Sequence, residues 1–318
     1  DVWLARGVTG IYRAVKVVWR DRFADFRPYE REFEGITRFA AISMREPFQL
    51  ALLHAGRKDA EGFFYYVMEL ADDLLRGRQI DPPSYQPATL AEWIASRPER
   101  PRAEDVINWC IPLTRAVASL HLAGLVHRDI KPSNVIMVRG VPTLADIGLV
   151  AFASARGTFV GTEGFVPPEG PGAPSADVYS LGKVLYELAM GRDRHDYPRL
   201  PYDLTTRPDQ QALLELNEVI VQACDPDPRK RFPDASALLE ALLTLQAGKS
   251  IRRRRSLRRR VLGSVRAAAV LAAIAGIAAG GAYFERRRAE EESAARYHAL
   301  VQTPAPSDNQ VEALEPTH

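Results

Sequence analysis

The sequence predicts an α+β fold, with a small β-rich N-terminal part and a larger helical C-terminal part, followed by a single transmembrane helix. Three observations predict it. Apolar segments separated by Gly-containing turns recur within residues 1–71. Segments with the periodicity of amphipathic helices recur within residues 72–246. An uncharged run of apolar and small residues then covers Ala267–Phe284, after a cluster of arginines.

The composition is that of a globular protein. Of the 318 residues, 46% are hydrophobic and 26% are charged, which excludes a disordered chain. Cys110 and Cys224 show no metal-ligand or C-x-x-C spacing, so we expect reduced thiols in a cytosolic fold. The net charge of +2 conceals a local cluster, because eight of the 42 Lys and Arg residues fall between Lys249 and Arg260. The chain starts at Asp1 without a signal peptide, and we expect that it begins within a longer protein.

The N-terminal part is predicted to contain four strands and one helix. The strands are expected where apolar side chains alternate or run together, at residues 1–6, 11–19, 48–55 and 62–70. A polar turn is expected at Gly56–Glu61. The helix is expected at Pro28–Phe39, because Phe33, Ile36 and Phe39 fall on one face and charged residues fall on another.

The C-terminal part is predicted to be mainly helical. Helices are expected at Thr89–Ala95, Ala103–Ala123, Ala176–Leu188, Leu213–Cys224 and Ala235–Leu245. The Pro-containing segment Leu74–Arg100 is expected to be an insert that carries no chemistry.

One polar stretch carries the side chains that phosphoryl transfer needs. It reads H-R-D-I-K-P-S-N over His127–Asn134, and A-D-I-G follows at Ala145–Gly148. Phosphoryl transfer needs a carboxylate that orients the acceptor hydroxyl and oxygen ligands that hold Mg²⁺. Asp129, Asn134 and Asp146 fit these roles. Two short strands around a turn between Asn134 and Asp146 would bring these two side chains together, as a shared metal site requires.

This stretch resembles the catalytic loop of the eukaryotic-like, or bacterial-type, Ser/Thr protein kinases, and D-I-G stands where that family has D-F-G. The resemblance covers about Val2–Leu245. It implies a two-lobed protein-kinase-like fold, with ATP and Mg²⁺ (or Mn²⁺) as cofactors and proteins with Ser or Thr acceptors as substrates. Lys131-Pro132 favours Ser or Thr over Tyr as the acceptor.

The resemblance also implies roles for individual residues. The catalytic residues would be Asp129, Lys131, Asn134 and Thr162, and the metal ligands would be Asn134 and Asp146. Asp129 would orient the acceptor hydroxyl. Lys131 would reach the γ-phosphate and screen its developing charge. Thr162 would hydrogen-bond to Asp129 and Lys131. His127 is expected to be a buried supporting residue rather than a base.

Ala14-Val15-Lys16 resembles the V-A-I-K of the family, so Lys16 would contact the α- and β-phosphates. Glu32 is our choice for the helix glutamate that pairs with Lys16, and Glu30 is the second choice. The remaining nucleotide-binding residues would be Val2, Ala14, Met68, Glu69, Ala71, Ile136 and Asp146. Met68 would be the gatekeeper, and the C=O of Glu69 and the N–H of Ala71 would face adenine.

The glycine-rich loop of the family would lie just ahead of Val2, and its glycines are missing from the sequence. We interpret this as a truncation, and we expect the chain as it stands to bind ATP poorly. Regulation is expected at Leu149–Val160, where Ser154 and Thr158 would be phosphoacceptors of an activation segment.

Two further features match the family. The stretch Gly161–Glu169 reads G-T-E-G-F-V-P-P-E, and Glu169 is expected to pair with Arg231 as a structural ion pair. Asp177 opens an apolar helix and is expected to anchor the backbone of the catalytic loop.

The segment after residue 246 predicts membrane attachment. We expect a basic juxtamembrane segment at 247–260, a transmembrane helix at 261–284 and an extracytoplasmic tail at 285–318. More Arg precedes the apolar run than follows it, so the catalytic part would lie in the cytoplasm, at the inner membrane. Arg252–Arg260 would bind anionic lipid rather than a specific nucleic acid, because no aromatic residues are interleaved. An Ala/Gly-rich soluble helix remains the alternative to the span.

Two other functions remain open. A pseudokinase scaffold would keep the fold without turnover, and a small-molecule phosphotransferase would share an H-x-D-x-x-x-x-N loop. Lys131-Pro132 and Gly161–Glu169 speak against the second. The oligomeric state is open as well, with a dimer as one alternative.

Overall fold

The computed structural model describes residues 1–44, 46, 48–97, 99–147, 150–152, 161–249 and 251–301. It divides into two compact units, Asp1–Arg252 and Arg253–His318, which are treated separately below. In the second unit the side chains are described from Leu271 to His298, except at positions 272 and 274.

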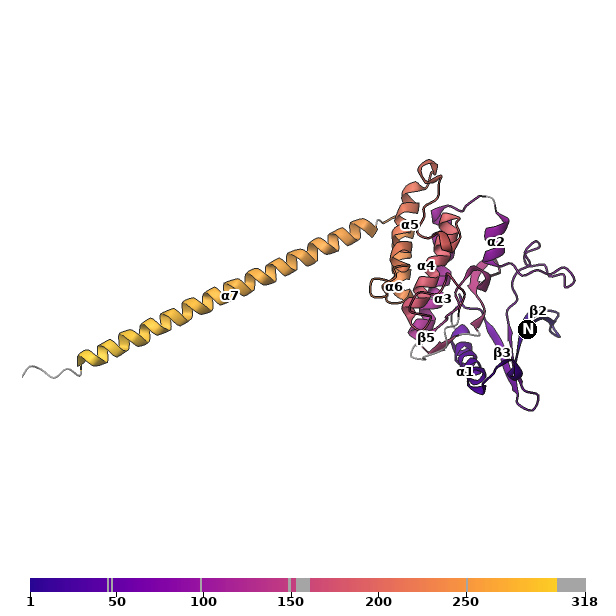
Figure 1. The fold of residues 1–318 in the computed structure, drawn as a ribbon, viewed down its shortest axis with the longest axis horizontal. Coiled ribbons are helices and arrows are strands. Elements are labelled where there is room, and N and C mark those ends of the chain that lie inside the picture. The colour runs from indigo at the N-terminus through magenta and orange to yellow at the C-terminus, as the bar shows by residue number, and fades with distance from the viewer. Residues whose placement is uncertain are drawn as a thin grey trace, which may run out of the picture. The chain divides into compact units, whose positions relative to one another are not determined.

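The N-terminal part is built on a four-stranded antiparallel sheet. Its strands are β1 (Val2–Arg6), β2 (Tyr12–Trp19), β3 (Leu52–Lys58) and β4 (Phe63–Met68), in the order β1-β2-β4-β3 (Figure 1). The β1–β2 turn closes with a hydrogen bond from the N–H of Gly10 to the C=O of Gly7, and Gly10 has a positive φ of 80°. The predicted hairpin is confirmed.

The third strand lies further along the chain than predicted. We expected a strand at Phe48–Ala55 and a turn at Gly56–Glu61, but β3 runs through Gly56 to Lys58. Gly56 lies opposite Tyr65 on β4, and a Cβ at Gly56 would be 2.7 Å from the Tyr65 ring. This glycine therefore makes room for a cross-strand aromatic side chain and does not mark a turn.

Helix α1 (Phe26–Ser43) packs on this sheet. Its first turn is capped by Asp25, which accepts a hydrogen bond from the N–H of Arg27. Ile36 and Phe39 are buried, as the periodicity predicted, and Phe33 is partly buried against the same core. Tyr29, which the prediction did not include, is buried too, and its ring centroid lies 5.0 Å from that of Phe64. Together with side chains of the sheet they form the smaller of two hydrophobic cores.

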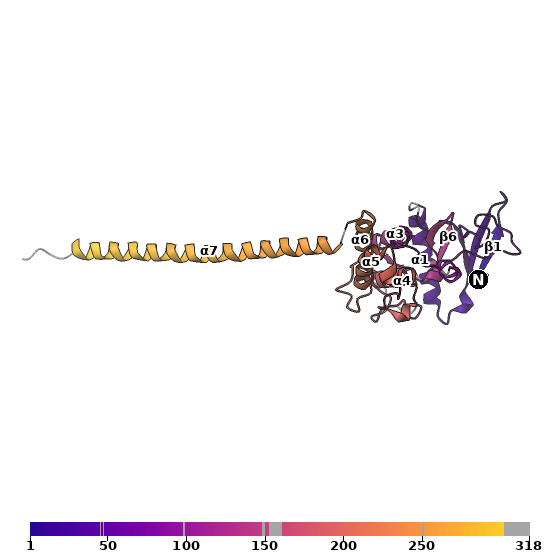
Figure 2. The same cartoon turned by 90° about the horizontal axis from the view of Figure 1, so that it is seen from above.

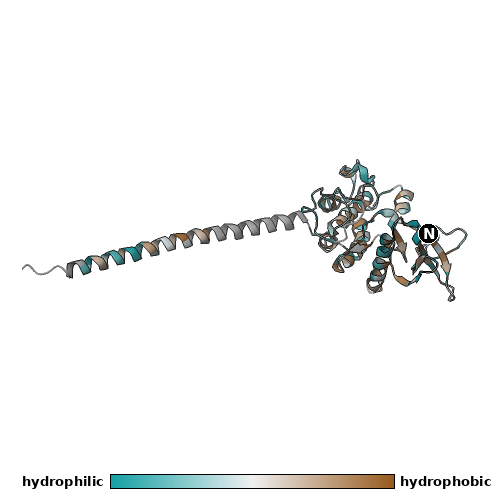
Figure 3. Ribbon diagram, turned by 60° about the horizontal axis from the view of Figure 1, so that its bottom comes forward, coloured by the Kyte–Doolittle hydropathy of each residue, from teal (hydrophilic) through white to brown (hydrophobic). Residues whose placement is uncertain are grey.

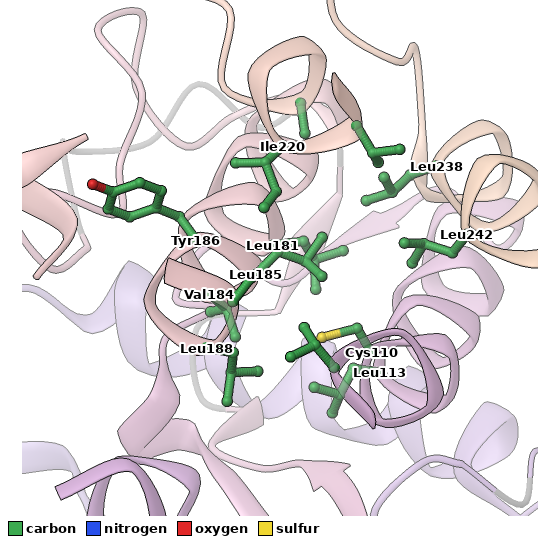
Figure 4. Close-up of a cluster of buried hydrophobic side chains, with 14 of the residues drawn as sticks. Cys110, Leu113, Leu181, Val184, Leu185, Tyr186, Leu188, Ile220, Leu238 and Leu242 are labelled. Carbon is green, nitrogen blue, oxygen red and sulfur yellow. The ribbon is translucent and has the colours of Figure 1, made fainter. Parts of the chain in front are cut away.

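The larger core belongs to the helical C-terminal part. Its helices are α2 (Leu90–Ser96), α3 (Ala103–Leu122), α4 (Pro174–Met190), α5 (Gln210–Ala223) and α6 (Ala235–Gln246), which Figure 2 shows from a second direction. Leu113 of α3, Leu185 of α4 and Leu242 of α6 meet in its centre (Figure 4). Cys110 and Cys224 are buried and free, as expected. All five helices lie within two or three residues of their predicted ends.

Short elements connect the two cores. Strand β5 (Leu125–Val126) pairs with β8 (Ala151–Phe152), and β6 (Val135–Val138) pairs with β7 (Val141–Leu144). Four 3₁₀ helices complete the described elements of this unit: η1 (Arg20–Arg22), η2 (Pro132–Asn134), η4 (Arg194–Asp196) and η5 (Leu204–Thr206).

The second unit contains one long helix, α7 (Ile251–Val301). In Figure 3 the described part of its ribbon changes from hydrophobic to hydrophilic colouring toward the C-terminal end. The helix continues past Glu285 to Val301, as predicted. A search of the described residues finds no helix with the length and apolar content needed to cross a membrane. Side chains of residues 251–270, where the predicted span 261–284 begins, and the tail from residue 302 lie outside the described residues, so the span remains a prediction.

Candidate active site

Asp129 is the centre of a compact hydrogen-bonded group. Its carboxylate accepts hydrogen bonds from Lys131 Nζ at 2.8 Å, Asn134 Nδ2 at 2.8 Å and Thr162 Oγ1 at 3.0 Å. Lys131 Nζ also donates to Thr162 Oγ1 at 2.7 Å, so Thr162 links the two residues as expected. Asp129 is only 8% exposed, and its three hydrogen-bond donors stabilise the negative charge of the carboxylate. A carboxylate fixed in this way can orient a hydroxyl group that approaches its remaining lone pairs.

Asp177, the buried aspartate in the first turn of α4, anchors the backbone of the His127–Asn134 loop. Its two carboxylate oxygens accept hydrogen bonds from the N–H groups of His127 at 2.7 Å and Arg128 at 2.9 Å. Arg128 has a left-handed backbone with φ of 72°, which a non-glycine residue rarely adopts. The two bonds from Asp177 hold this conformation, as the sequence predicted for an anchor of the loop.

His121 is a part of this group that sequence reasoning missed. Its Nε2 lies 3.0 Å from Asp177 Oδ2, and its Nδ1 accepts a hydrogen bond from the N–H of Ala235 at 3.1 Å. His121 thereby connects the anchor to the start of α6. A single histidine on an amphipathic helix carries no signal that would have shown this role.

The β6–β7 hairpin brings Asn134 and Asp146 to the same end of two paired strands. Val135 pairs with Leu144, and the N–H of Ala145 donates to the C=O of Asn134 at 2.7 Å. The predicted juxtaposition is confirmed, and the turn sits at Arg139-Gly140, both with positive φ. Asp72 caps this turn, because its carboxylate accepts hydrogen bonds from the N–H groups of both turn residues at 3.1 and 2.7 Å.

The oxygen donors of Asn134 and Asp146 suit a divalent cation. Asn134 Nδ2 is directed at Asp129, which leaves the amide oxygen for another partner. The described residues contain no group of three His, Cys, Asp or Glu side chains that could hold a metal ion. A site of one carboxylate and one amide fits Mg²⁺ only when phosphate oxygens and water complete the shell.

Lys16 pairs with Asp146 rather than with Glu32. Lys16 Nζ lies 2.7 Å from Asp146 Oδ1, and the ion pairs among the described residues include none between Lys16 and Glu32. Burial raises the pKa of Glu32 to about 7, and the charge of Lys16 opposes this shift. Glu30 is excluded as the alternative, because both of its oxygens bind Arg57, at 2.6 and 2.8 Å.

The pKa of Lys16 is raised even though burial disfavours its charged form. Tyr66, its cross-strand partner, and Asp146 together outweigh the burial effect. Lys16 therefore stays protonated at neutral pH and can bind an anion.

The expected adenine-contacting residues come together only in part. Ala14 and Met68 are buried in the smaller core, and Ile136 packs against it partly exposed. Val2 lies opposite Lys16 on β1 and is 61% exposed.

Glu69 and Ala71 follow β4 as the hinge prediction requires. The Glu69 carboxylate pairs with Arg139, and the C=O of Ala71 accepts a hydrogen bond from the Tyr85 hydroxyl at 3.0 Å. The chain then pairs with β6, because the N–H of Met137 donates to the C=O of Ala88 at 2.9 Å.

Two supporting predictions agree with the geometry. His127 is 1% exposed, and burial lowers its pKa, so it is a neutral core residue. Glu169 and Arg231 form a two-pronged ion pair, with Arg231 Nη2 at 2.9 Å from Glu169 Oε2. The expected phosphoacceptors Ser154 and Thr158, like Gly148 of the D-I-G motif, lie outside the described residues.

Comparison with known proteins agrees with this geometry. The family model described as a protein kinase domain matches residues 83–253, which include Asp129, Lys131, Asn134, Asp146 and Thr162. The serine/threonine-protein kinase PknL of Mycobacterium tuberculosis is 34% identical over 181 residues, covering 48% of this chain and 44% of PknL.

Two corynebacterial relatives match over a longer stretch. The serine/threonine-protein kinase drp72 of Corynebacterium efficiens is 29% identical over 267 residues, covering 78% of this chain and 48% of the relative. PknA of Corynebacterium glutamicum is 28% identical over 267 residues, covering 78% of this chain and 54% of PknA. The chain thus spans about half of the length of the curated relatives that it matches. Because the family model matches more than half of the 318 residues, the chain belongs to the protein kinase family.

Proposed function

We propose that this chain carries the catalytic part of a Ser/Thr protein kinase, which transfers the γ-phosphoryl group of ATP to Ser or Thr hydroxyls of proteins. The observation that carries the proposal is the Asp129 carboxylate, held by Lys131, Asn134 and Thr162 within 3.0 Å. Phosphoryl transfer relies on positioning and charge stabilisation more than on covalent chemistry, and this group supplies both.

In the proposed reaction Asp129 accepts a hydrogen bond from the acceptor hydroxyl and aligns its oxygen with the γ-phosphorus. Lys131 neutralises the charge of Asp129 and stabilises the negative charge that develops on the transferred group. Thr162 fixes the positions of Asp129 and Lys131 relative to each other, because its hydroxyl donates a hydrogen bond to Asp129 and accepts one from Lys131. Lys16, protonated at neutral pH, would bind the α- and β-phosphates.

Asn134 and Asp146 are the proposed ligands of Mg²⁺ or Mn²⁺. When bound, the cation would neutralise charge on the phosphate oxygens. The apolar floor and roof for adenine would come from Ala14, Met68, Ile136 and Val2, and the backbone of Glu69–Ala71 would contact its edge.

We further propose attachment to the inner membrane, with the catalytic part in the cytoplasm. Residues 1–71 and 72–246 would be the two kinase lobes, 261–284 the span and 285–318 the tail on the other side. The support is the sequence alone: the arginine-rich segment 247–260 and the uncharged run after it. Anionic lipid would bind Arg252–Arg260.

One observation favours a second candidate, a pseudokinase scaffold. Lys16 is paired with Asp146 and not with Glu32, whereas nucleotide binding needs both Lys16 and Asp146 to face phosphates and metal. A scaffold of this kind would keep the fold and bind partners without turnover.

A transfer assay tests the proposal. The protein should carry the glycine-rich loop expected ahead of Val2, either natural or grafted. It is incubated with Mg²⁺ and ATP labelled at the γ-phosphate, with and without a generic protein substrate. We expect label on Ser and Thr, and a loss of about 10²-fold or more in Asp129→Asn, because the orienting carboxylate is removed.

Asp105→Asn is the matched control, since Asp105 is an exposed aspartate on α3. The Asp105→Asn variant should transfer as much labelled phosphate as the parent chain does. Equal labelling of the Asp129→Asn and parent chains, or no label in either, would defeat the kinase proposal. ATP binding without any transfer would instead support the scaffold.

A further inference from the structure

A cavity of about 610 Å³ lies beside the proposed acceptor site. Lys131 and Ser133 of the catalytic loop and Thr162 and Phe165 of the following segment form one of its walls. Lys131 and Thr162 both contact Asp129. A substrate segment whose hydroxyl reaches Asp129 therefore brings its neighbouring side chains to this cavity.

The lining of the cavity is also rich in arginine. Arg97 and Arg100 follow α2, and Arg192 and Arg194 follow α4. Arg97 is exposed, and its guanidinium carbon lies 4.4 Å from the centroid of the Trp93 ring. Stacking on an indole fixes the plane of a guanidinium group and leaves its N–H edge open to a carboxylate.

Arg97 differs from its neighbours in having no acidic partner. Across the described part of the chain, no Asp or Glu lies within ion-pair distance of it. Arg100, by contrast, pairs with Asp203 and donates to the C=O of Met190 at 3.0 Å. Arg192 donates to the C=O of Leu200 at 3.1 Å.

The carboxylates that line the cavity are mostly neutralised. Glu187 accepts a hydrogen bond from the N–H of Arg194 at 3.1 Å and lies 3.4 Å from its Nη1. Asp193 accepts a hydrogen bond from the N–H of His195 and also pairs with Arg194 at 3.4 Å. Glu99, the third acidic side chain of the lining, is exposed. The cavity thus offers an unpaired cation and few unpaired anions.

We propose that this cavity binds an acidic side chain, Asp or Glu, that flanks the acceptor Ser or Thr of the protein substrate, with Arg97 as the residue that determines the preference. The inference rests on the proposed kinase function and names its substrate class. It also assigns a role to the segment 74–100, which the sequence suggested would carry no chemistry.

The test uses three peptides with the same Thr acceptor, flanked on both sides by Glu, by Ala or by Lys. kcat/KM is measured for the protein carrying a natural or grafted glycine-rich loop, and for its Arg97→Ala, Arg97→Glu and Arg102→Ala variants. Arg102 is the matched control, because it is exposed and does not line the cavity. A second readout is the fluorescence anisotropy of labelled peptides in which Ala replaces the Thr, which needs no turnover.

We expect the Glu peptide to exceed the Ala peptide by about tenfold in kcat/KM, the size of one good charge-assisted contact. Arg97→Ala should remove this preference, Arg97→Glu should shift it toward the Lys peptide, and Arg102→Ala should keep it. Equal kcat/KM and equal Kd for the Glu and Ala peptides would overturn the inference. Binding of the Glu peptide that depends on Arg97, without any transfer, would keep the inference and defeat the proposed kinase function.

Discussion

Arg128 and Asp146, two residues of the site, have left-handed backbone, with φ of 72° and 57°. Such conformations cost a non-glycine residue about 1–3 kcal/mol each. For Arg128 the cost is offset by Asp177, whose carboxylate accepts two backbone hydrogen bonds, and bonds to a charged group contribute about 1.5–3 kcal/mol each. The strain directs the loop so that Asp129 and Lys131 face Thr162, and the arrangement depends on the anchor.

Glu32 is the residue whose charge is most sensitive to pH in the site. Burial raises its pKa from 4.5 to about 7. Between these two pH values the folded chain binds more protons than the unfolded chain, so the free energy of unfolding falls as the pH rises through this window.

We predict that Glu32→Gln abolishes this decrease in the free energy of unfolding with rising pH. Relative to the variant, the parent chain should lose about 1–2 kcal/mol of its free energy of unfolding between pH 5 and pH 8, a value reduced for the partial exposure of Glu32. Urea unfolding at both pH values measures the difference. Glu34→Gln, an exposed glutamate on the same helix, is the control and should keep the pH dependence of the parent chain. Equal dependence in Glu32→Gln and the parent chain would contradict the prediction.

At the scale of elements, the Glu169–Arg231 pair joins the segment before α4 to the segment before α6. The side chain of Arg231 is fully buried. It also donates to the C=O groups of Asp225 at 2.6 Å and Ser175 at 3.2 Å. One buried arginine thus satisfies several backbone carbonyl groups and the partly exposed Glu169 carboxylate, and this favours a single arrangement of the two segments.

We predict that Arg231→Met lowers the free energy of unfolding by about 2–3 kcal/mol, because the carbonyl groups lose a buried charged donor while the partly exposed Glu169 carboxylate can be hydrated. Arg229→Met should change it by less than about 0.5 kcal/mol, since Arg229 is 89% exposed and pairs only with Asp227 nearby in the chain. Chemical denaturation of both variants measures the two values. Similar losses of unfolding free energy in the two variants would show that the buried position of Arg231 contributes nothing to stability.

At the scale of the whole molecule, the two units differ in how they are held together. Asp1–Arg252 contains two hydrophobic cores, whereas the described side chains of α7 are almost all exposed. Leu271 and Ile277 are 67% and 76% exposed on this helix. A helix that buries so little apolar surface within its own unit gains little from folding in water, and the proposed membrane attachment would supply this burial.

We predict that Leu271→Arg combined with Ile277→Arg releases the protein from membranes. Each arginine near the centre of a span costs about 2.5–3.5 kcal/mol of insertion free energy. The measurement is the fraction of protein that stays with carbonate-washed membranes after expression. Ala294→Arg combined with Ala295→Arg, in the polar part of α7, is the control and should stay bound. Retention of the Leu271/Ile277 variant at the control level would contradict the predicted span.

The sequence by itself determined the features that rest on local patterns. The ends of α2 to α6 followed from 3.6-residue periodicity, whereas α1 extends beyond its predicted range at both ends. The choice of Asp129, Lys131 and Asn134 followed from the contiguous stretch His127–Asn134, and that of Asp146 from the A-D-I-G that follows it. The Glu169–Arg231 pair and the anchor Asp177 followed from resemblance to the family. The end of β3 did not follow, because Gly56 predicts a turn by its residue type but faces Tyr65 across the sheet within the strand.

Only the tertiary structure decided which charged groups meet. Lys16 and Asp146 are 130 residues apart, and nothing in the sequence distinguishes Asp146 from Glu32 as the partner of Lys16. The same holds for the contact of His121 with Asp177 and for the cavity lined by Arg97. Partner choice depends on distances and burial set by the packing of several elements, and these change the energies of charges by more than any local propensity does.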